Sequence, residues 1–152
     1  MKSYNSLNTN NKYKILFVCL GNICRSPAAE AMLGCVAERE GISDLLIIDS
    51  AGTYGGHSGE RSDARMRRAA AARGIDITHR ARQVREEDFE RFDMVIAMDD
   101  NNYENLFRLA PDRDAQQKID FDDVDQNQIV LLVGELLRRH GCAVQRPGHD
   151  DE

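Results

Sequence analysis

Short apolar runs alternate along the chain with longer segments of helix-forming residues. The apolar runs are continuous, as expected of strands that are covered on both faces in a parallel sheet. We predict strands at 14–20, 45–48 and 94–98, with a short fourth strand at 118–121.

The segments between these runs predict helices. One is expected from Ala28 to Glu40, because Pro27 is tolerated in a first helical turn and Gly41 ends the run of helix formers. Further helices are expected at 62–73, 86–92, 101–109 and 129–139. The alternation predicts an α/β three-layer sandwich with a short, about four-stranded parallel sheet and right-handed crossovers.

Length and composition favour a single domain. The chain has 152 residues, of which 41% are hydrophobic, and this is enough to bury one core. We predict a disordered tail at 1–12, a single domain at 13–142 and a polar C-terminal tail at 143–152, because both ends are rich in polar residues.

Charge and hydropathy narrow the function classes. The formal net charge of −6 argues against nucleic acid as a partner, since binding a phosphodiester backbone normally requires a basic face. No stretch approaches the roughly 18 to 20 apolar residues of a membrane span, and the first residues lack the apolar centre of a secretory signal. We therefore expect a soluble cytoplasmic protein with no membrane partner.

The cysteine pattern predicts reduced thiols and no metal site. Cys19, Cys24, Cys35 and Cys142 show no dense regular spacing, and no pair has the separation that starts a zinc site. The four histidines offer no complementary ligand pair. We expect neither a metal nor a cofactor.

The loop after the first predicted strand has the residues needed to bind and attack a phosphate group. Cys19 ends the strand and Arg25 opens the helix, so the five residues between them can wrap around one tetrahedral anion. Gly21 and Asn22 accept the unusual dihedrals that a ring of inward-pointing N–H groups needs. The expected phosphate-binding residues are Leu20, Gly21, Asn22, Ile23, Cys24 and Ser26.

Positive potential at this loop would stabilise a thiolate nucleophile. Helix N-terminal amides donate hydrogen bonds there, and the Arg25 guanidinium can bind two phosphate oxygens in a fork. The Ser26 hydroxyl is placed to donate to the Cys19 sulfur and to assist its departure. These residues predict a phosphatase that uses Cys19 as nucleophile and Arg25 as phosphate binder.

The motif CLGNICRSP resembles the signature of the low-molecular-weight protein tyrosine phosphatase family. The resemblance spans about residues 14 to 119 and includes DSAGT at 49–53, RGIDITHRARQ at 73–83 and DMVIAMDDNN at 93–102. It implies that a hydrogen-bond network supports the phosphate loop through Asn22, Ser26, Ser50 and His79. It also implies support from Asp99 and Asn102, and an aromatic wall at Tyr54.

Some of these residues have ordinary structural interpretations. Asp99 could cap the helix that starts near Asn101, and Tyr54 could be an exposed turn residue. Ser50 could simply end a strand, and His79 could be a polar loop residue.

Two further loop residues bear on regulation and substrate. Cys24 is close enough in sequence to Cys19 for a reversible disulfide, and the resemblance implies that this protects the nucleophile; the alternative is a small packing residue. Ile23 favours phosphotyrosine, because arginine phosphatases of similar sequence carry Thr there. An arsenate reductase would need two downstream cysteines in a mobile segment, so it is a weaker interpretation.

The chain departs from the family at its expected general acid. The family places an Asp-Pro pair before its last helix, whereas this chain contains no Asp-Pro. Asp122, Asp123 and Asp125 are the available candidates; the alternative is a solvated acidic linker in which Asp125 helps to cap the helix. Two hypotheses follow: a phosphatase acting on a phosphotyrosine protein or small aryl phosphate, or a phosphotyrosine-binding module with weak or no turnover.

Overall fold

The computed structural model describes residues 12–121. The predicted helix at 129–139, the polar C-terminal tail and nearly all of the predicted N-terminal tail lie outside this range. The division of the chain into one domain and two tails therefore stays a prediction.

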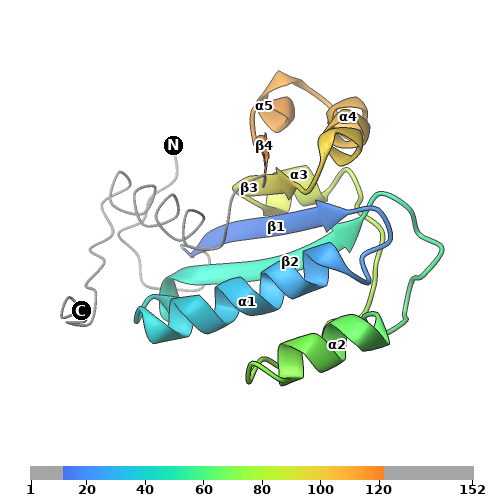
Figure 1. Ribbon diagram of the computed structural model, residues 1–152. Coiled ribbons are helices and arrows are strands. Elements are labelled where there is room, and N and C mark those ends of the chain that lie inside the picture. The colour runs from blue at the N-terminus through green and yellow to red at the C-terminus, as the bar shows by residue number, and fades with distance from the viewer. Residues whose placement is uncertain (1–11, 122–152) are drawn as a thin grey trace.

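A four-stranded parallel sheet forms the centre of the described region (Figure 1). The strand order is β2-β1-β3-β4, and every neighbouring pair is parallel, as the apolar runs predicted. All four carboxyl ends therefore meet at one edge of the sheet, where ligands bind in folds of this kind. The strands are β1 (Tyr13–Cys19), β2 (Leu46–Gly52), β3 (Met94–Ala97) and β4 (Ile119–Phe121).

Helices cover both faces of the sheet, which confirms the predicted three layers. Ile15 and Phe17 of β1 pack with Leu33 of α1 (Arg25–Arg39) on one face. Leu16 and Val18 pack on the opposite face, with side chains from the later helices. Those helices are α3 (Asp88–Arg91), α4 (Asp100–Leu109) and α5 (Arg113–Gln116).

Two other helical segments complete the described region. α2 (Ala64–Ala71) lies on the same side of the sheet as α1 in Figure 1 and has no buried residue. A 3₁₀ turn, η2 (Ser43–Leu45), precedes β2 and was not predicted, and neither was α5. No helix between residues 12 and 121 is long and apolar enough to span a membrane.

β2 extends further than its apolar run. The sequence predicted a loop from Asp49, but the strand continues to Gly52, with Ser50 paired opposite Phe17 and Gly52 opposite Cys19. Because Ser50 finds hydrogen-bond partners for its hydroxyl in the interior, its polarity does not end the strand.

Candidate active site

The segment from Cys19 to Arg25 joins β1 to α1 at the carboxyl edge of the sheet. Cys19 is buried, with an exposed fraction of 3%, and Arg25 is the first residue of α1. Asn22 has a φ of 60°, a left-handed conformation that asparagine tolerates better than most residues. The loop therefore has the curved backbone that the sequence predicted between these two residues.

The second β–α connection packs closely against this loop. The N–H groups of Thr53 and Tyr54 donate to the carbonyl oxygens of Cys19 and Leu20 at 2.9 and 2.8 Å. A Cβ atom at Gly52 would lie 2.6 Å from the Leu20 carbonyl oxygen, so only glycine fits there. Gly52 was not singled out from the sequence, although it belongs to the DSAGT segment.

The Cys19 sulfur contacts one hydroxyl group. Cys19 Sγ and Ser26 Oγ lie 3.0 Å apart, and both residues are buried. Asn22 Nδ2 donates to Ser26 Oγ at 2.8 Å, which leaves the hydroxyl hydrogen for the sulfur or for the more distant Ala51 carbonyl at 3.4 Å. The geometry allows Ser26 to stabilise negative charge on the sulfur.

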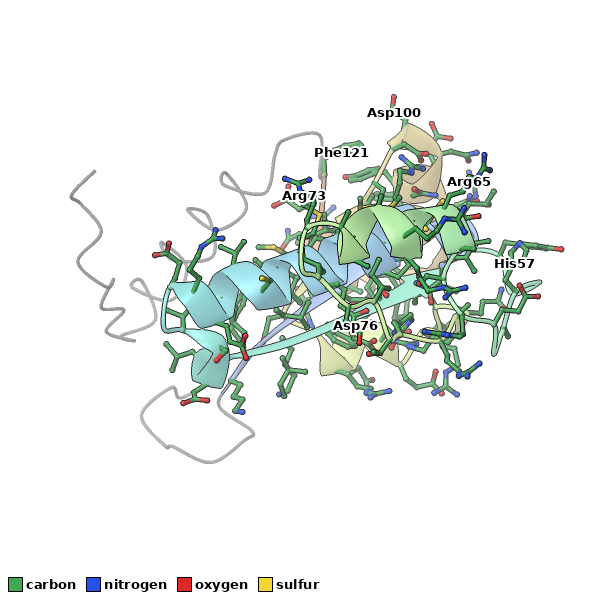
Figure 2. All side chains as sticks on the ribbon, turned by 60° about the horizontal axis from the view of Figure 1, so that its bottom comes forward. His57, Arg65, Arg73, Asp76, Asp100 and Phe121 are labelled. Atoms are coloured by element: carbon green, nitrogen blue, oxygen red, sulfur yellow. The ribbon has the colours of Figure 1, made fainter. Side chains whose placement is uncertain are left out.

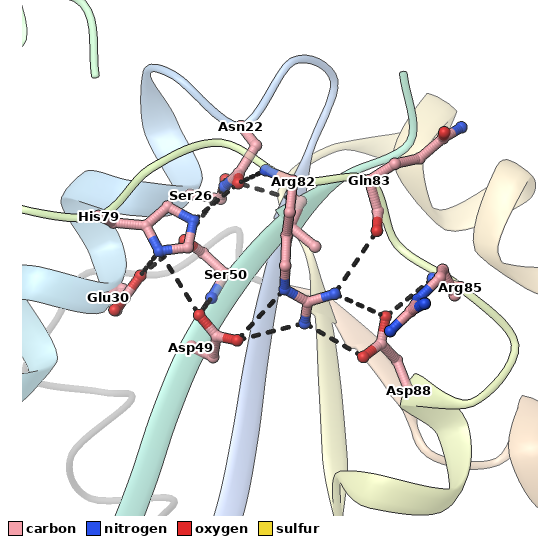
Figure 3. A network of polar contacts seen from close by, with 11 residues as sticks. Asn22, Ser26, Glu30, Asp49, Ser50, His79, Arg82, Gln83, Arg85 and Asp88 are labelled. Carbon is pink, nitrogen blue, oxygen red and sulfur yellow. Dashed lines mark hydrogen bonds and ion pairs between the residues drawn. The ribbon is translucent and has the colours of Figure 1, made fainter. Parts of the chain in front are cut away.

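The Asn22 side chain is a hub of hydrogen bonds behind the loop (Figure 3). Its Nδ2 also donates to Ser50 Oγ at 3.1 Å. Its Oδ1 accepts from His79 Nε2 at 2.8 Å and from the backbone N–H of Arg82 at 2.9 Å. The structure thus brings Asn22, Ser26, Ser50 and His79 into one network, and these are the four residues that the resemblance grouped.

A second layer of charged residues surrounds this hub. Ser50 Oγ donates to Glu30 Oε1 at 2.7 Å, and His79 Nδ1 lies 3.3 Å from Glu30 Oε1 and 3.5 Å from Asp49 Oδ1. Arg82 pairs with Asp49 Oδ2 at 3.2 Å. None of the three charged partners Glu30, Asp49 and Arg82 was predicted from the sequence, although Asp49 and Arg82 lie within the segments that carry the resemblance.

Burial shifts the pKa values in this layer. Burial is the main cause that raises the pKa of Glu30 to about 7, and the neighbouring Asp49 adds to it. Burial also lowers the pKa of His79, against an opposing effect of Asp49. Burial opposes the charge of Arg82 too, but its contacts with Asp88 and Asp49 outweigh this and raise its pKa.

Arg25 extends from the loop to the end of the third strand. Its guanidinium donates to Asp99 Oδ2 at 2.8 Å and to the Met98 carbonyl at 3.2 Å. Asp99 also accepts from the Asn102 backbone N–H at 2.8 Å and so caps α4. Asp99 therefore makes both the predicted contact with the loop region and the alternative helix cap. Asn102 is buried, and its Oδ1 has no hydrogen-bond partner among the described residues.

Exposed apolar side chains lie at and beside the phosphate loop. Leu20 and Tyr54 are each 56% exposed, and Tyr54 meets the His57 ring edge to face. Figure 2 shows His57 at the end of the molecule where the strands finish. A cavity of about 280 Å³ adjoins this surface, and it is lined by Leu20, Thr53, Tyr54, Gln83, Val84, Asn105 and Leu109.

The described contacts show no role for several of the predicted site residues. Ile23 is half-buried and Cys24 is exposed; both Cys19 and Cys24 are free thiols. Burial, Asp63 and Cys19 raise the pKa of Cys24. The general-acid candidates Asp122, Asp123 and Asp125, like Cys142, lie outside the described residues.

Comparisons with known proteins agree with this architecture. A sequence profile described as low molecular weight phosphotyrosine protein phosphatase matches residues 14–128. The low molecular weight protein-tyrosine-phosphatase of Streptomyces coelicolor is 46% identical over 104 residues, which cover 68% of this chain and 63% of the relative. The chain spans less than two thirds of the length of such curated relatives.

Solved structures show the same similarity. A protein tyrosine phosphatase from Entamoeba histolytica matches with a TM-score of 0.69 and 44% identity, covering 71% of this chain and 69% of that one. An arginine phosphatase from Drosophila matches with a TM-score of 0.67 and 34% identity, covering 71% and 69%. The fold is therefore the α/β fold of these solved phosphatases. The chain belongs to the low molecular weight phosphotyrosine protein phosphatase family.

Proposed function

We propose that the protein is a protein-tyrosine phosphatase that hydrolyses aryl phosphomonoesters through a phosphocysteine on Cys19. The observation that carries the proposal is the 3.0 Å contact of the Cys19 sulfur with Ser26, inside a loop that Arg25 closes. Membership of the family supports it. The comparisons also favour an enzyme over a module that only binds phosphate.

In the first step, the Cys19 thiolate attacks phosphorus and the bond to the tyrosine oxygen breaks. Loop N–H groups and the Arg25 guanidinium bind the three phosphoryl oxygens as charge develops on them. Asp99 holds that guanidinium at 2.8 Å in the described structure, so it acts as a positioning residue for Arg25. The product of this step is a phosphocysteine and the free phenol.

In the second step, water attacks the phosphocysteine and the sulfur leaves as a thiolate. Ser26 donates a hydrogen bond to the departing sulfur from 3.0 Å, because Ser26 Oγ accepts from Asn22 and keeps its own hydrogen for donation. Inorganic phosphate and the starting thiolate are the products.

A general acid would protonate the tyrosine oxygen as it leaves. We propose Asp122, Asp123 or Asp125 for this role, because the acidic run follows β4 directly in the sequence. Such help is typically worth about 10² to 10⁴ in rate, so an enzyme without it would act mainly on esters with good leaving groups.

The residues beside the loop favour an aromatic substrate. Ile23 is aliphatic where arginine phosphatases of similar sequence carry Thr, and the exposed Tyr54 offers a ring face. A phosphotyrosine protein or small aryl phosphate is therefore the proposed substrate, with phosphoarginine as the alternative because of the similar Drosophila enzyme. We propose a cytoplasmic location on composition alone.

Oxidation provides a separate proposal for Cys24. Peroxide would convert the Cys19 thiolate to a sulfenic acid, and the Cys24 thiol would then displace hydroxide, giving a disulfide and water. Mass spectrometry after peroxide treatment should find the disulfide in the parent and higher oxides of Cys19 in Cys24→Ser.

The catalytic proposal is tested with aryl phosphates of differing leaving-group acidity. Cys19→Ser should abolish turnover, and replacing the true general acid by Asn should slow esters with poor leaving groups far more than nitrophenyl phosphate. If none of the three Asp→Asn variants matters while Cys19→Ser is inactive, the acid assignment is wrong and the nucleophile stands. A parent protein that binds phosphate but hydrolyses no ester would support the binding-module alternative.

A further inference from the structure

Three side chains from separate parts of the sequence converge behind the phosphate loop. Glu30 comes from α1, Asp49 from β2, and His79 from the segment that precedes α3. One ligand-type atom of each residue lies within 4.8 Å of the other two, and all three side chains are half-buried (Figure 3). The expectation of no metal was based on spacing along the chain, which does not reveal residues that meet only in space.

The hydrogen bonds of Asn22 place a hydrogen on Nε2 of His79. Asn22 Oδ1 accepts from the Arg82 backbone N–H at 2.9 Å, so it must also be the acceptor toward His79 Nε2 at 2.8 Å. His79 Nε2 is therefore the donor. The remaining ring nitrogen, Nδ1, faces carboxylate oxygens of Glu30 and Asp49.

The space between His79 Nδ1 and the two carboxylate oxygens can hold either a proton on the imidazole or a bound cation. His79 Nδ1 is 3.3 Å from Glu30 Oε1 and 3.5 Å from Asp49 Oδ1. Bonds of about 2.0 to 2.2 Å from zinc to nitrogen and oxygen would place tetrahedral ligands roughly 3.3 to 3.6 Å apart. The two observed separations fall close to that spacing.

The surroundings resemble those of bound metals in other respects. His79 donates its other ring N–H to an oxygen, as histidine ligands of metals usually do, and Ser50 donates to Glu30 Oε1. Arg82 binds Asp49 through Oδ2, while Oδ1 accepts from the Ser50 backbone N–H at 2.8 Å and also faces the histidine. A cavity of about 180 Å³ lined partly by Glu30 and His79 gives access and room for a water ligand.

We propose that Glu30, Asp49 and His79 form a binding site for a divalent transition-metal cation such as Zn²⁺. One imidazole nitrogen and two carboxylate oxygens suit this class of ion, and a water molecule completes four ligands. The site is distinct from the proposed catalytic cysteine. A bound cation would hold His79 in the form that donates to Asn22, and so would stabilise the phosphate loop without taking part in turnover.

Titration of the full chain with Co²⁺, followed by visible absorption, tests this site. The expected result is saturation at one equivalent, with the bands of nitrogen and oxygen coordination and displacement by Zn²⁺. Glu30→Gln and Asp49→Asn should each weaken binding by about tenfold or more. Asp76→Asn is the matched control, because Asp76 lines the same cavity outside the cluster and should leave the affinity unchanged.

A second measurement on the parent protein guards against variants that fail to fold. Co²⁺ should shift the His79 ring signals in an NMR spectrum and leave those of His57 in place, since His57 pairs with Glu60 in the separate loop that contacts Gly21. Absence of saturable binding, thiolate-to-cobalt charge-transfer bands, or unchanged affinity in folded Glu30 and Asp49 variants would overturn the proposal. The cluster would then hold a shared proton only.

Discussion

At the residue scale, Asn22 combines a backbone role with a side-chain role. Its left-handed φ of 60° turns the loop, and its amide bonds to Ser26, Ser50, His79 and the Arg82 backbone. Asn22 is 1% exposed, so water cannot replace these partners. The conformation of the phosphate loop therefore depends on one buried amide.

Asn22→Ala should lower both stability and activity. Buried partners left without hydrogen bonds cost about 1 to 3 kcal/mol, and the loop would lose the group that orients Ser26. Urea unfolding should show a loss in this range, and kcat on nitrophenyl phosphate should fall more than KM rises. Asn101→Ala is the control, since Asn101 is exposed on α4; an equal loss in both variants would contradict this role.

Asp99 makes stability depend on pH in a defined direction. The Arg25 hydrogen bond, followed by the one from the Asn102 backbone, lowers the pKa of Asp99. The stabilisation of the fold by ionised Asp99 is therefore fully present above the unfolded pKa of about 3.9. It is lost as the pH falls through the lower pKa of Asp99 in the folded protein.

Asp99→Asn should isolate this charge, because Asn also caps helices well. The parent should be more stable than the variant at pH 6, and the difference should shrink as the pH falls below about 4. Urea unfolding across that range measures it, with Asp100→Asn as the control in the next position. A difference that is constant with pH would show that the Arg25 contact adds no stability.

At the element scale, α2 depends on its cap more than on packing. No residue of α2 is buried, and the Asp63 side chain accepts from the N–H groups of Arg65 and Met66, both at 3.1 Å. The Asp63 backbone N–H also donates to the Ile23 carbonyl at 2.7 Å, which connects this cap to the phosphate loop.

Asp63→Ala should cost about 1 kcal/mol, since the side-chain cap is lost while the backbone contact to Ile23 remains. Chemical denaturation measures the change, and hydrogen exchange should show faster opening of α2 than of α1. Glu104→Ala, at an exposed position of α4, is the control and should be nearly neutral. Unchanged exchange in α2 would mean that its stability comes from elsewhere.

Most elements were predictable from the sequence, including the short α3 and β4, whereas η2, α5 and the polar end of β2 were not. β1 and β3 follow from continuous apolar runs that are buried on both faces. β2 was predicted too short because Asp49 and Ser50 read as a loop, although hydrogen bonds satisfy them inside the sheet. α5 has four residues, too few for helical periodicity, and the cap at Asp112 was its only local signal.

The candidate site also has a part that was predictable from the sequence and a part that was not. The residues from Cys19 to Ser26 are consecutive, so their chemistry can be recognised in the sequence. The contact of Glu30 with His79 joins positions 49 residues apart, and it follows only from how α1 and the later segment pack against β2. The sequence pattern therefore predicts the nucleophile and its loop, but it does not predict the charged residues Glu30, Asp49 and Arg82 behind the loop.

At the scale of the whole molecule, the Arg82 side chain connects β2 to α3 (Figure 3). Its guanidinium bonds to both oxygens of Asp88 at 3.1 Å and to Asp49 Oδ2 at 3.2 and 3.3 Å. The Asp88 side chain is only 1% exposed, whereas Asp49 is 29% exposed. Of the two carboxylates that pair with Arg82, the Asp88 carboxylate is therefore the one that water does not reach.

Arg82→Met should destabilise the fold by roughly 3 to 5 kcal/mol, because it leaves the buried Asp88 carboxylate without its cation. The backbone N–H of Arg82 still bonds to Asn22, so the loss comes from the ion pair. Combining Arg82→Met with Asp88→Leu should recover part of the stability, since no buried charge then remains. Urea unfolding of both variants measures this, with Arg80→Met as the exposed control. If the double variant is as unstable as Arg82→Met, the cost lies in lost packing around residue 82 and not in the unpaired carboxylate.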